Sequence, residues 1–246
     1  MITEKIESLQ HKLVKHCVKL KNSRKYREEN REIILVGEAP IMEVASYHLP
    51  KTLFVPAGFE LEQSLSVSNT ISVSDEVARK VTGFDRSFPF ALYDFPEHED
   101  FSCKNRLLII DEIQDPGNLG TIFRTAYALG FEGIYLTPSS VDPFNDKAIS
   151  ASKGTCLYLP FRFTGISELE KIIDTKNKHV YVADLTGTDC KNTSFQDPAM
   201  LVLSHEKKGA RKWSFSSTSV KIPMQKGIDS MNVAVAGAIL MHEMSR

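Results

Sequence analysis

The sequence lacks the features that mark membrane and secreted proteins. In its 246 residues the longest apolar run has nine residues, from Val233 to Met241, whereas a membrane-spanning helix needs about 18. No apolar block follows the first lysines, so a signal peptide is not expected either. We therefore expect a protein of the cytoplasm without a transmembrane segment.

Cysteine is also sparse. Cys17, Cys103, Cys156 and Cys190 lie 86, 53 and 34 positions apart, without a CxxC pair or a histidine at ligand spacing. Zinc sites and disulfide frameworks need closer spacings, so we expect reduced, mostly buried thiols and no metal site. The absence of a GxGxxG fingerprint and of a P-loop argues against a nucleotide-dependent α/β enzyme.

The composition is that of a folded chain, but its charge is unevenly distributed. Hydrophobic residues make up 42% and charged residues 25% of the sequence, which excludes wholesale disorder. Residues 1–31 contain nine Lys and Arg against four Glu, while the rest of the chain carries a net charge of −6. A cationic segment on an acidic body indicates contact with a polyanion such as RNA. A solvated helix face explains the same charges equally well.

The first hundred residues predict a small α/β or α+β domain. Apolar residues recur at helical spacing from Glu4 to Leu20, and Asn22 and Ser23 interrupt the pattern. Short apolar runs then predict strands, at 33–36, 53–55, 70–73 and 88–93. Residues 96–105 are acidic, polar and without periodicity, so we place a linker there. The expected domains are therefore residues 1–100 and 105–246.

The second domain alternates between predicted strands and helices. The strands are expected at 107–110, 133–136, 179–183 and 200–203, and the helices at 119–129, 146–153, 166–176 and 230–243. This alternation is typical of a parallel sheet covered by helices on both faces. Ligands bind such sheets at the carboxyl ends of the strands, where loops lead into helices.

Two of the loops at such strand ends precede helices. In the loop from Asp111 to Arg124, Asn118 is expected to cap the helix, which would leave backbone N–H groups open to an anion. In the loop at 220–233, Asp229 or Ser230 is expected to cap the last helix.

The loop at 220–233 also contains Asn232, which would begin an otherwise apolar segment and needs a polar partner. A further loop, at 201–209, places Glu206 and Gly209 after an apolar strand. Capping and turn chemistry account for each loop taken alone, so no single loop identifies a function.

Together, however, the three loops resemble the signature motifs of the SpoU-type (TrmH-like) RNA 2′-O-ribose methyltransferases of the SPOUT superfamily. The matching residues are Asn118, Gly120 and Arg124 in the first loop, Glu206 and Gly209 in the second, and Ile222-Pro-Met224 with Ser230-Met-Asn-Val233 in the third. The stretch 142–154 resembles the family's connecting segment. More loosely, residues 8–38 are similar to an attached substrate-binding domain. Three motifs in order are far more specific than any one of them.

The resemblance implies a fold, a cofactor and a partner. The fold is a parallel-sheet α/β methyltransferase domain with a C-terminal trefoil knot, preceded by a small α/β (L30e-like) RNA-binding domain. The cofactor is S-adenosylmethionine, and the protein is a homodimer in which each site draws residues from both subunits. The substrate is a ribose 2′-hydroxyl, in ribosomal RNA first and in tRNA as the alternative.

The resemblance also implies the site residues. The catalytic residues are Arg124, Asn118, Ser230, Asn232 and Glu206, and the cofactor-binding residues are Leu203, Ser204, Gly209, Ile222, Met224, Met231 and Val233. Because arginine stays protonated, we expect Arg124 to orient the hydroxyl and to stabilise the developing oxyanion rather than to act as a base.

One residue departs from the family pattern. Ser204 stands where the family usually has glycine, and glycine in such a place permits close approach of the backbone. A serine side chain there would crowd the cofactor. The alternative function is therefore a non-catalytic RNA-binding or ribosome-assembly factor with the same fold.

Overall fold

The chain folds into two compact units in a computed structural model that describes residues 2–63, 65–96, 101, 103–176, 178–205, 211–228 and 230–246. The first unit comprises Met1–Pro96 and Phe144–Tyr158, and the second comprises Glu97–Pro143 and Leu159–Arg246. The second unit therefore begins near the predicted linker. The segment 144–158, which overlaps the expected connecting stretch 142–154, belongs to the first unit. The predicted functional domains 1–100 and 105–246 stay a prediction.

The first unit is built on a mixed five-stranded sheet in the order β1-β4-β3-β5-β2. Strands β1, β4 and β3 run parallel, whereas β5 is antiparallel to both β3 and β2. The strands are β1 (Ile2–Ile6), β2 (Glu32–Val36), β3 (Thr52–Pro56), β4 (Thr70–Val73) and β5 (Phe90–Asp94). The helices of this unit are α1 (Lys12–Asn22), α2 (Arg24–Asn30), α3 (Glu38–Ala45), α4 (Asp75–Thr82) and α6 (Asp146–Ser152).

The start of the chain differs from the prediction. The expected helix from Glu4 to Leu20 begins only at Lys12, where the His11 side chain accepts a hydrogen bond from the backbone N–H of Leu13 and caps α1. Residues 2–6 instead form β1 beside β4. Ile6 is buried in either arrangement, so apolar spacing alone did not separate strand from helix. The predicted interruption at Ser23 is confirmed, because Ser23 caps α2.

The segment 144–158 packs on the first unit through aromatic contacts. The rings of Phe95 and Phe144 lie 4.9 Å apart, and those of Tyr47 and Tyr158 are stacked at 4.1 Å. A Cβ on Gly154 would lie 2.4 Å from a side-chain carbon of Val44 on α3, so only glycine permits this approach. Its φ of +83° makes the same demand on the backbone.

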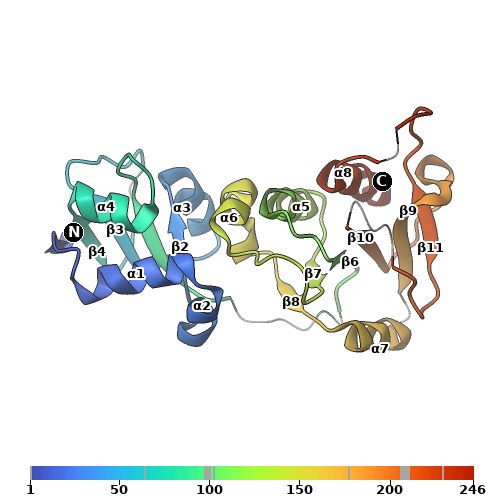
Figure 1. Ribbon diagram of the computed structural model, residues 1–246, viewed down its shortest axis with the longest axis horizontal. Coiled ribbons are helices and arrows are strands. Elements are labelled where there is room, and N and C mark those ends of the chain that lie inside the picture. Colours follow the sequence, from blue (N-terminus) through green and yellow to red (C-terminus); the bar gives the residue numbers. More distant parts are fainter. Residues whose placement is uncertain are drawn as a thin grey trace. The chain divides into compact units, whose positions relative to one another are not determined.

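The second unit contains an all-parallel six-stranded sheet in the order β11-β9-β10-β6-β7-β8 (Figure 1). The strands are β6 (Arg106–Asp111), β7 (Gly133–Leu136), β8 (Phe161–Phe163), β9 (His179–Asp189), β10 (Ala199–Ser204) and β11 (Thr218–Lys221). The helices are α5 (Pro116–Ala128), α7 (Ile166–Lys176) and α8 (Val233–Ser245). The predicted parallel sheet is confirmed. Strands β8 and β11 were missed because each has only three or four residues and few buried side chains.

Helices cover both faces of this sheet, as predicted. In Figure 1, α5 and α8 lie on one side of the sheet and α7 on the other. On the α7 face a continuous core joins Leu169 and Ile173 to alternate residues of β6, β9 and β10, and Phe101 adds its ring from the predicted linker. None of the described helices is both long enough and apolar enough to cross a lipid bilayer.

Candidate active site

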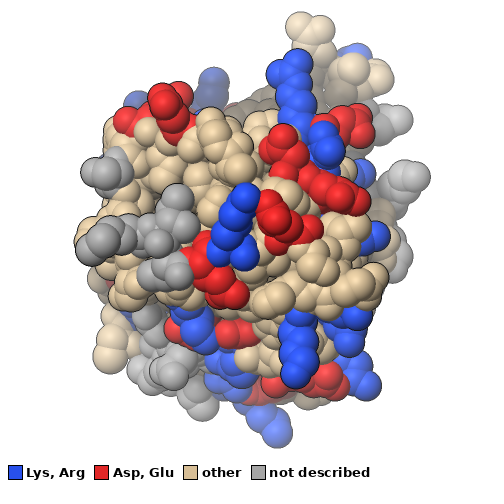
Figure 2. Space-filling model, turned by 90° about the vertical axis from the view of Figure 1, so that its left-hand side faces the viewer, with Lys and Arg blue, Asp and Glu red and all other residues tan. Residues whose placement is uncertain are grey.

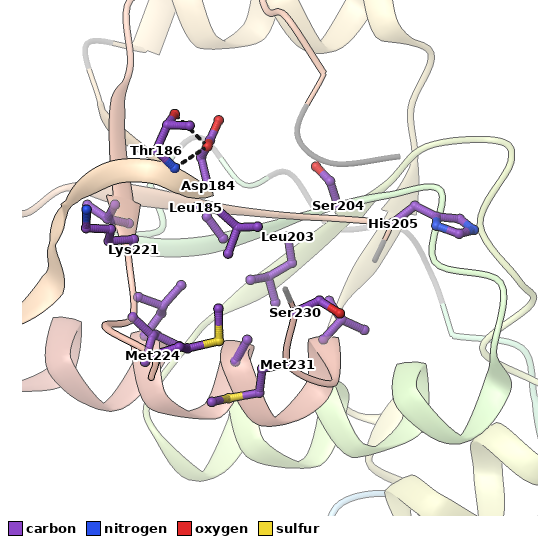
Figure 3. Close-up of a pocket in the computed structure, with 16 residues that line it drawn as sticks. Asp184, Leu185, Thr186, Leu203, Ser204, His205, Lys221, Met224, Ser230 and Met231 are labelled. Carbon is purple, nitrogen blue, oxygen red and sulfur yellow. Dashed lines mark hydrogen bonds between the residues drawn. The ribbon is translucent and has the colours of Figure 1, made fainter. Parts of the chain in front are cut away.

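A cavity of about 400 Å³ opens in the second unit near the carboxyl ends of β9, β10 and β11. That volume is in the range of small-ligand sites. Mostly apolar residues line it, from four segments of the chain: Ala183–Thr186, Leu203–His205, Val220–Met224 without Pro223, and Ser230–Leu240 in part. In Figure 3 the side chains of Leu203, Met224 and Met231 point toward one another.

The residues expected to bind a cofactor come together in this cavity. Its lining includes all of them that the structure describes: Leu203, Ser204, Ile222, Met224, Met231 and Val233, together with the candidate catalytic residue Ser230. Gly209 and Glu206 lie outside the described residues. The second and third motif loops, which are well separated in sequence, therefore share one site.

Strand β9 supplies a part of the lining that sequence reasoning missed. Along β11 the pairing partner changes from Val182, opposite Ser219, to Thr188, opposite Val220, so residues 183–187 leave the regular register. Within this excursion the carboxylate of Asp184 accepts hydrogen bonds from the backbone N–H and the hydroxyl of Thr186, both at 2.8 Å (Figure 3). The sequence did contain a signal for this excursion: Asp184 and Gly187 follow an apolar run, just as polar residues and a glycine follow the apolar strand in the loop at 201–209.

Two glycines allow close packing beside the cavity. A Cβ on Gly187 would lie 2.4 Å from the backbone carbon of Ser219, so glycine is needed where β9 crosses β11. A Cβ on Gly237 would lie 2.7 Å from Leu203, which brings α8 close to β10. Both approaches place backbone near the cavity, where the ends of parallel strands leave N–H and C=O groups for a ligand.

Ser204 does not close the cavity. It lines a space that stays open with the serine present, and its side chain lies on the opposite side of β10 from that of Leu203 (Figure 3). Its hydroxyl oxygen is buried and has no hydrogen-bond partner in the described structure. A buried hydroxyl without a partner is costly, so Ser204 lowers the stability of the end of β10.

A side-chain hydrogen bond joins the first motif to the third. Asn232 Nδ2 donates to Asn118 Oδ1 at 2.9 Å, and Asn232 Oδ1 accepts from the backbone N–H groups of Ala234 and Val235. Asn232 therefore caps α8 and contacts Asn118 at the same time. It stands between Met231 and Val233, which both line the cavity.

Two capping predictions are wrong. Helix α5 begins at Pro116 and is capped by Asp115, whose carboxylate accepts from the backbone N–H of Asn118 at 2.7 Å. Proline suits the first turn of a helix, so the helix begins before Asn118. The side chain of Asn118 is therefore not used as a cap and accepts the hydrogen bond from Asn232. Helix α8 begins at Val233 rather than at residue 230 and is capped by Asn232, not by Ser230. Asp229 lies outside the described residues.

Arg124 lies half-buried on α5, the helix that packs against α8. It belongs neither to the cavity lining nor to the contact between Asn118 and Asn232. Within the described part of one chain, the structure thus unites Asn118 with Asn232, and Ser230 with the cavity, while Arg124 is not among the residues that line the cavity.

Arg211 connects the segment after the second motif to the start of the first, a link that was not predicted. Its guanidinium bonds Asp111 at 3.2 Å and Glu112 at 2.9 Å. The hydrogen bond with Asp111, which is 3% exposed at the end of β6, raises the pKa of Arg211. The described residues contain no group of three or more His, Cys, Asp or Glu side chains able to hold a metal ion.

Comparison with known proteins decides the family. The family model described as "SpoU rRNA Methylase family" matches residues 105–242, more than half of the chain. The chain belongs to the SpoU rRNA methylase family. This confirms the family and the α/β fold inferred from the three motifs. The enzyme class, an RNA methyltransferase that uses S-adenosylmethionine, is confirmed with it.

Individual members of the SpoU family are similar over different lengths. The 23S rRNA (guanosine(2553)-2'-O)-methyltransferase RlmP of Bacillus subtilis is 25% identical and covers 98% of this chain and 99% of its own. An uncharacterized tRNA/rRNA methyltransferase of Synechocystis is 34% identical over 56% of this chain, which spans about half (52%) of that relative's length. A crystal structure of an RNA 2′-O ribose methyltransferase matches with a TM-score of 0.80, 25% identity and coverage of 98% and 97%.

Proposed function

We propose that this SpoU family member methylates a ribose 2′-hydroxyl, in ribosomal RNA first and in tRNA as the alternative. The observation that carries the proposal is the hydrogen bond between Asn118 and Asn232 beside the cavity. This bond joins the first turn of α5 to the segment 231–233, which lines the cavity. The similarity to RlmP over nearly the whole chain supports ribosomal RNA over tRNA, and such a substrate is met in the cytoplasm.

The cavity suits S-adenosylmethionine. Leu203, Ile222, Met224, Met231 and Val233 offer an apolar surface, and the backbone at the ends of β10 and β11 offers polar groups. When bound, the cofactor supplies a methyl group from its sulfonium sulfur, and the rest of the cofactor leaves as a neutral thioether.

The chain's own residues must position and activate the ribose hydroxyl, because it is a poor nucleophile at neutral pH. We assign Asn118 and Asn232 to holding α5 against the segment that lines the pocket. Ser230 lines the cavity and is assigned to contact the bound molecule. Arg124 orients the hydroxyl and stabilises the negative charge that develops on its oxygen as the proton passes to solvent water. Glu206 and Gly209 keep the roles that the family resemblance implies.

A homodimer completes this site in our proposal. Three apolar side chains of the second unit are largely exposed: Leu185 at 59%, Ile228 at 58% and Val235 at 50%. Leu185 lines the cavity, and Val235 follows the Asn232 cap of α8. Their burial against a second copy would remove apolar surface from water, and the second copy would contribute its Arg124. The trefoil knot formed by the C-terminal segment belongs to the same proposal.

Asn232→Asp tests the proposal. Aspartate keeps the oxygen that caps α8, but it loses the N–H that bonds Asn118 and sets two acceptors against each other. We expect methyl transfer to fall about 10- to 100-fold, the cost of one unpaired polar contact of 1–3 kcal/mol. The measurement is transfer of labelled methyl groups to ribosomal RNA and tRNA transcripts, with calorimetry of S-adenosylmethionine alongside.

Asn145→Asp is the matched control, because Asn145 also caps a helix with its side-chain oxygen but lies in the first unit. It should leave transfer unchanged. Absence of cofactor binding by the parent protein, with RNA present, would reject the enzyme and favour the non-catalytic RNA-binding factor.

A further inference from the structure

The structure separates the basic residues of the N-terminal segment into paired and unpaired groups. Four of the nine form ion pairs: Lys5 with Glu7, Lys21 with Asp146, Arg24 with Glu28 and Lys25 with Glu29. Two more are engaged elsewhere. Arg27 is buried and donates to the carbonyl of Leu20 at 2.6 Å, and the Arg31 guanidinium lies 4.5 Å from the centre of the Phe95 ring. Most of the positive charge counted in the sequence is therefore already compensated or committed.

Three lysines remain, and all are on α1. Lys12, Lys15 and Lys19 are exposed and form no ion pair with any described residue. Lys19, like Arg31, lies near an aromatic ring: its ammonium group is 5.4 Å from the centre of the Tyr26 ring, which carries no compensating charge. Arg31 is left out of the group because it follows α2 and is not part of α1. We call Lys12, Lys15 and Lys19 the α1 lysine stripe.

The spacing of the stripe puts its charges on one side of the helix. Residues three and four apart are neighbours on a helix surface, and Lys19 lies seven positions after Lys12, about 10 Å further along the axis. The opposite side of α1 is fixed, because Val14, Cys17 and Leu20 are buried in the core of the first unit. The lysines are thus held outward by packing.

Figure 2 shows a face of the molecule on which Lys and Arg side chains are interspersed with Asp and Glu side chains. Acidic surface repels phosphate, so cations that are paired with carboxylates attract a polyanion less than cations without such a partner.

We propose that the α1 lysine stripe is a contact surface for the phosphate backbone of the RNA substrate. This inference rests on the proposed function, since it concerns how that substrate is held. Three ammonium groups without ion pairs release condensed counterions when they meet phosphates, whereas cations already paired with carboxylates gain less. The stripe therefore supplies affinity that is independent of base sequence, and the reacting ribose is selected elsewhere.

The test compares two triple variants of the full chain. Lys12→Gln, Lys15→Gln and Lys19→Gln removes the stripe. Lys5→Gln, Arg24→Gln and Lys25→Gln removes three exposed cations of the same segment that are ion-paired. Both variants lose the same net charge, and glutamine has a helix propensity close to that of lysine and arginine. Filter binding of an in vitro 23S ribosomal RNA transcript is measured over a series of salt concentrations.

We expect the stripe variant to bind the transcript about tenfold or more weakly and to lower the slope of log affinity against log salt by about 2, or about 0.7 for each lost phosphate contact. The control variant should change neither quantity by more than a small fraction of this. KM for RNA should rise in the stripe variant with kcat unchanged, and calorimetry of S-adenosylmethionine should be unaltered.

Equal losses in the two variants would overturn the proposal, because net charge alone would then explain them. Unchanged RNA binding by the stripe variant would overturn it as well. If the parent protein bound RNA through the stripe but transferred no methyl group to any RNA, the proposed function would fail while the contact surface stood.

Discussion

The two units of the chain differ in how the polar groups at the ends of their strands are satisfied. In the first unit, Glu32 accepts from His16 at 2.6 Å and from Lys51 at 2.7 Å, and Lys51 also bonds Asp94 at 3.0 Å. These contacts raise the pKa of Lys51. In the second unit, the Ser204 hydroxyl at the end of β10 is buried without a partner in the described structure. These polar groups of the first unit satisfy one another, whereas the Ser204 hydroxyl of the second unit has no such partner among the described residues.

The two units also differ in how completely their interiors are filled. The core of the first unit is closed by Phe54 and Phe90, stacked 4.5 Å apart. The second unit keeps a cavity of about 400 Å³ between its sheet and α8. A domain that leaves such a space unfilled forgoes packing energy, which is typical of a unit that binds a small molecule rather than one that presents a surface.

The largest effect is expected from Phe54→Ala, which tests whether the units are independent. Removal of a fully buried ring from the first unit should cost about 3–5 kcal/mol of its free energy of unfolding, measured by urea denaturation. Affinity for S-adenosylmethionine should stay the same, because the cavity lies wholly in the second unit. Phe84→Ala, at a side chain that is 54% exposed, serves as the control. Loss of cofactor binding in Phe54→Ala would mean that the units do not act separately.

Gly187→Ala should have the next largest effect, on the second unit alone. The added methyl group would meet the backbone of Ser219 and Val220 at 2.4–2.5 Å, so β9 and β11 must separate. We expect a loss of about 1–3 kcal/mol in stability and at least tenfold weaker binding of S-adenosylmethionine in calorimetry. Gly165→Ala, where a methyl group meets nothing within 4 Å, should leave binding unchanged. Equal binding by both variants would show that the β9 excursion does not shape the cavity.

Ser204→Ala should give the smallest change, of opposite sign. Removal of a buried hydroxyl without a partner should raise the free energy of unfolding of the ligand-free protein by about 1 kcal/mol. Ser140→Ala is its counterpart, since the Ser140 hydroxyl donates to the carbonyl of Ile110 at 3.2 Å, and it should lower stability by a similar amount. Thermal and urea denaturation measure both. A destabilised Ser204→Ala protein would mean that the hydroxyl is already satisfied.

Much of the second unit was accessible from the sequence because its signals are local. The predicted helix 166–176 coincides with α7, and continuous apolar runs marked the central strands. The second and third motifs identified residues that line the pocket without any knowledge of their contacts. In the first unit the strand 70–73 was likewise predicted at its observed bounds.

Three of the failures depend on contacts between distant residues. Pairing with β4 makes residues 2–6 a strand, although their spacing also suits a helix. The register change of β9 depends on β11, which lies more than 30 positions later. The partner of Arg211 lies 100 positions earlier, at Asp111. Local pattern cannot choose among the many carboxylates available for such an ion pair.

The double duty of Asn232 gives the site a spectroscopic reporter. The same amide that touches Asn118 also holds the backbone N–H groups of Ala234 and Val235. Any rotation of this side chain away from the first loop also loosens the opening turn of α8. The hydrogen-exchange rates of those two amides therefore follow the joining of the loops, residue by residue, without a substrate having to react.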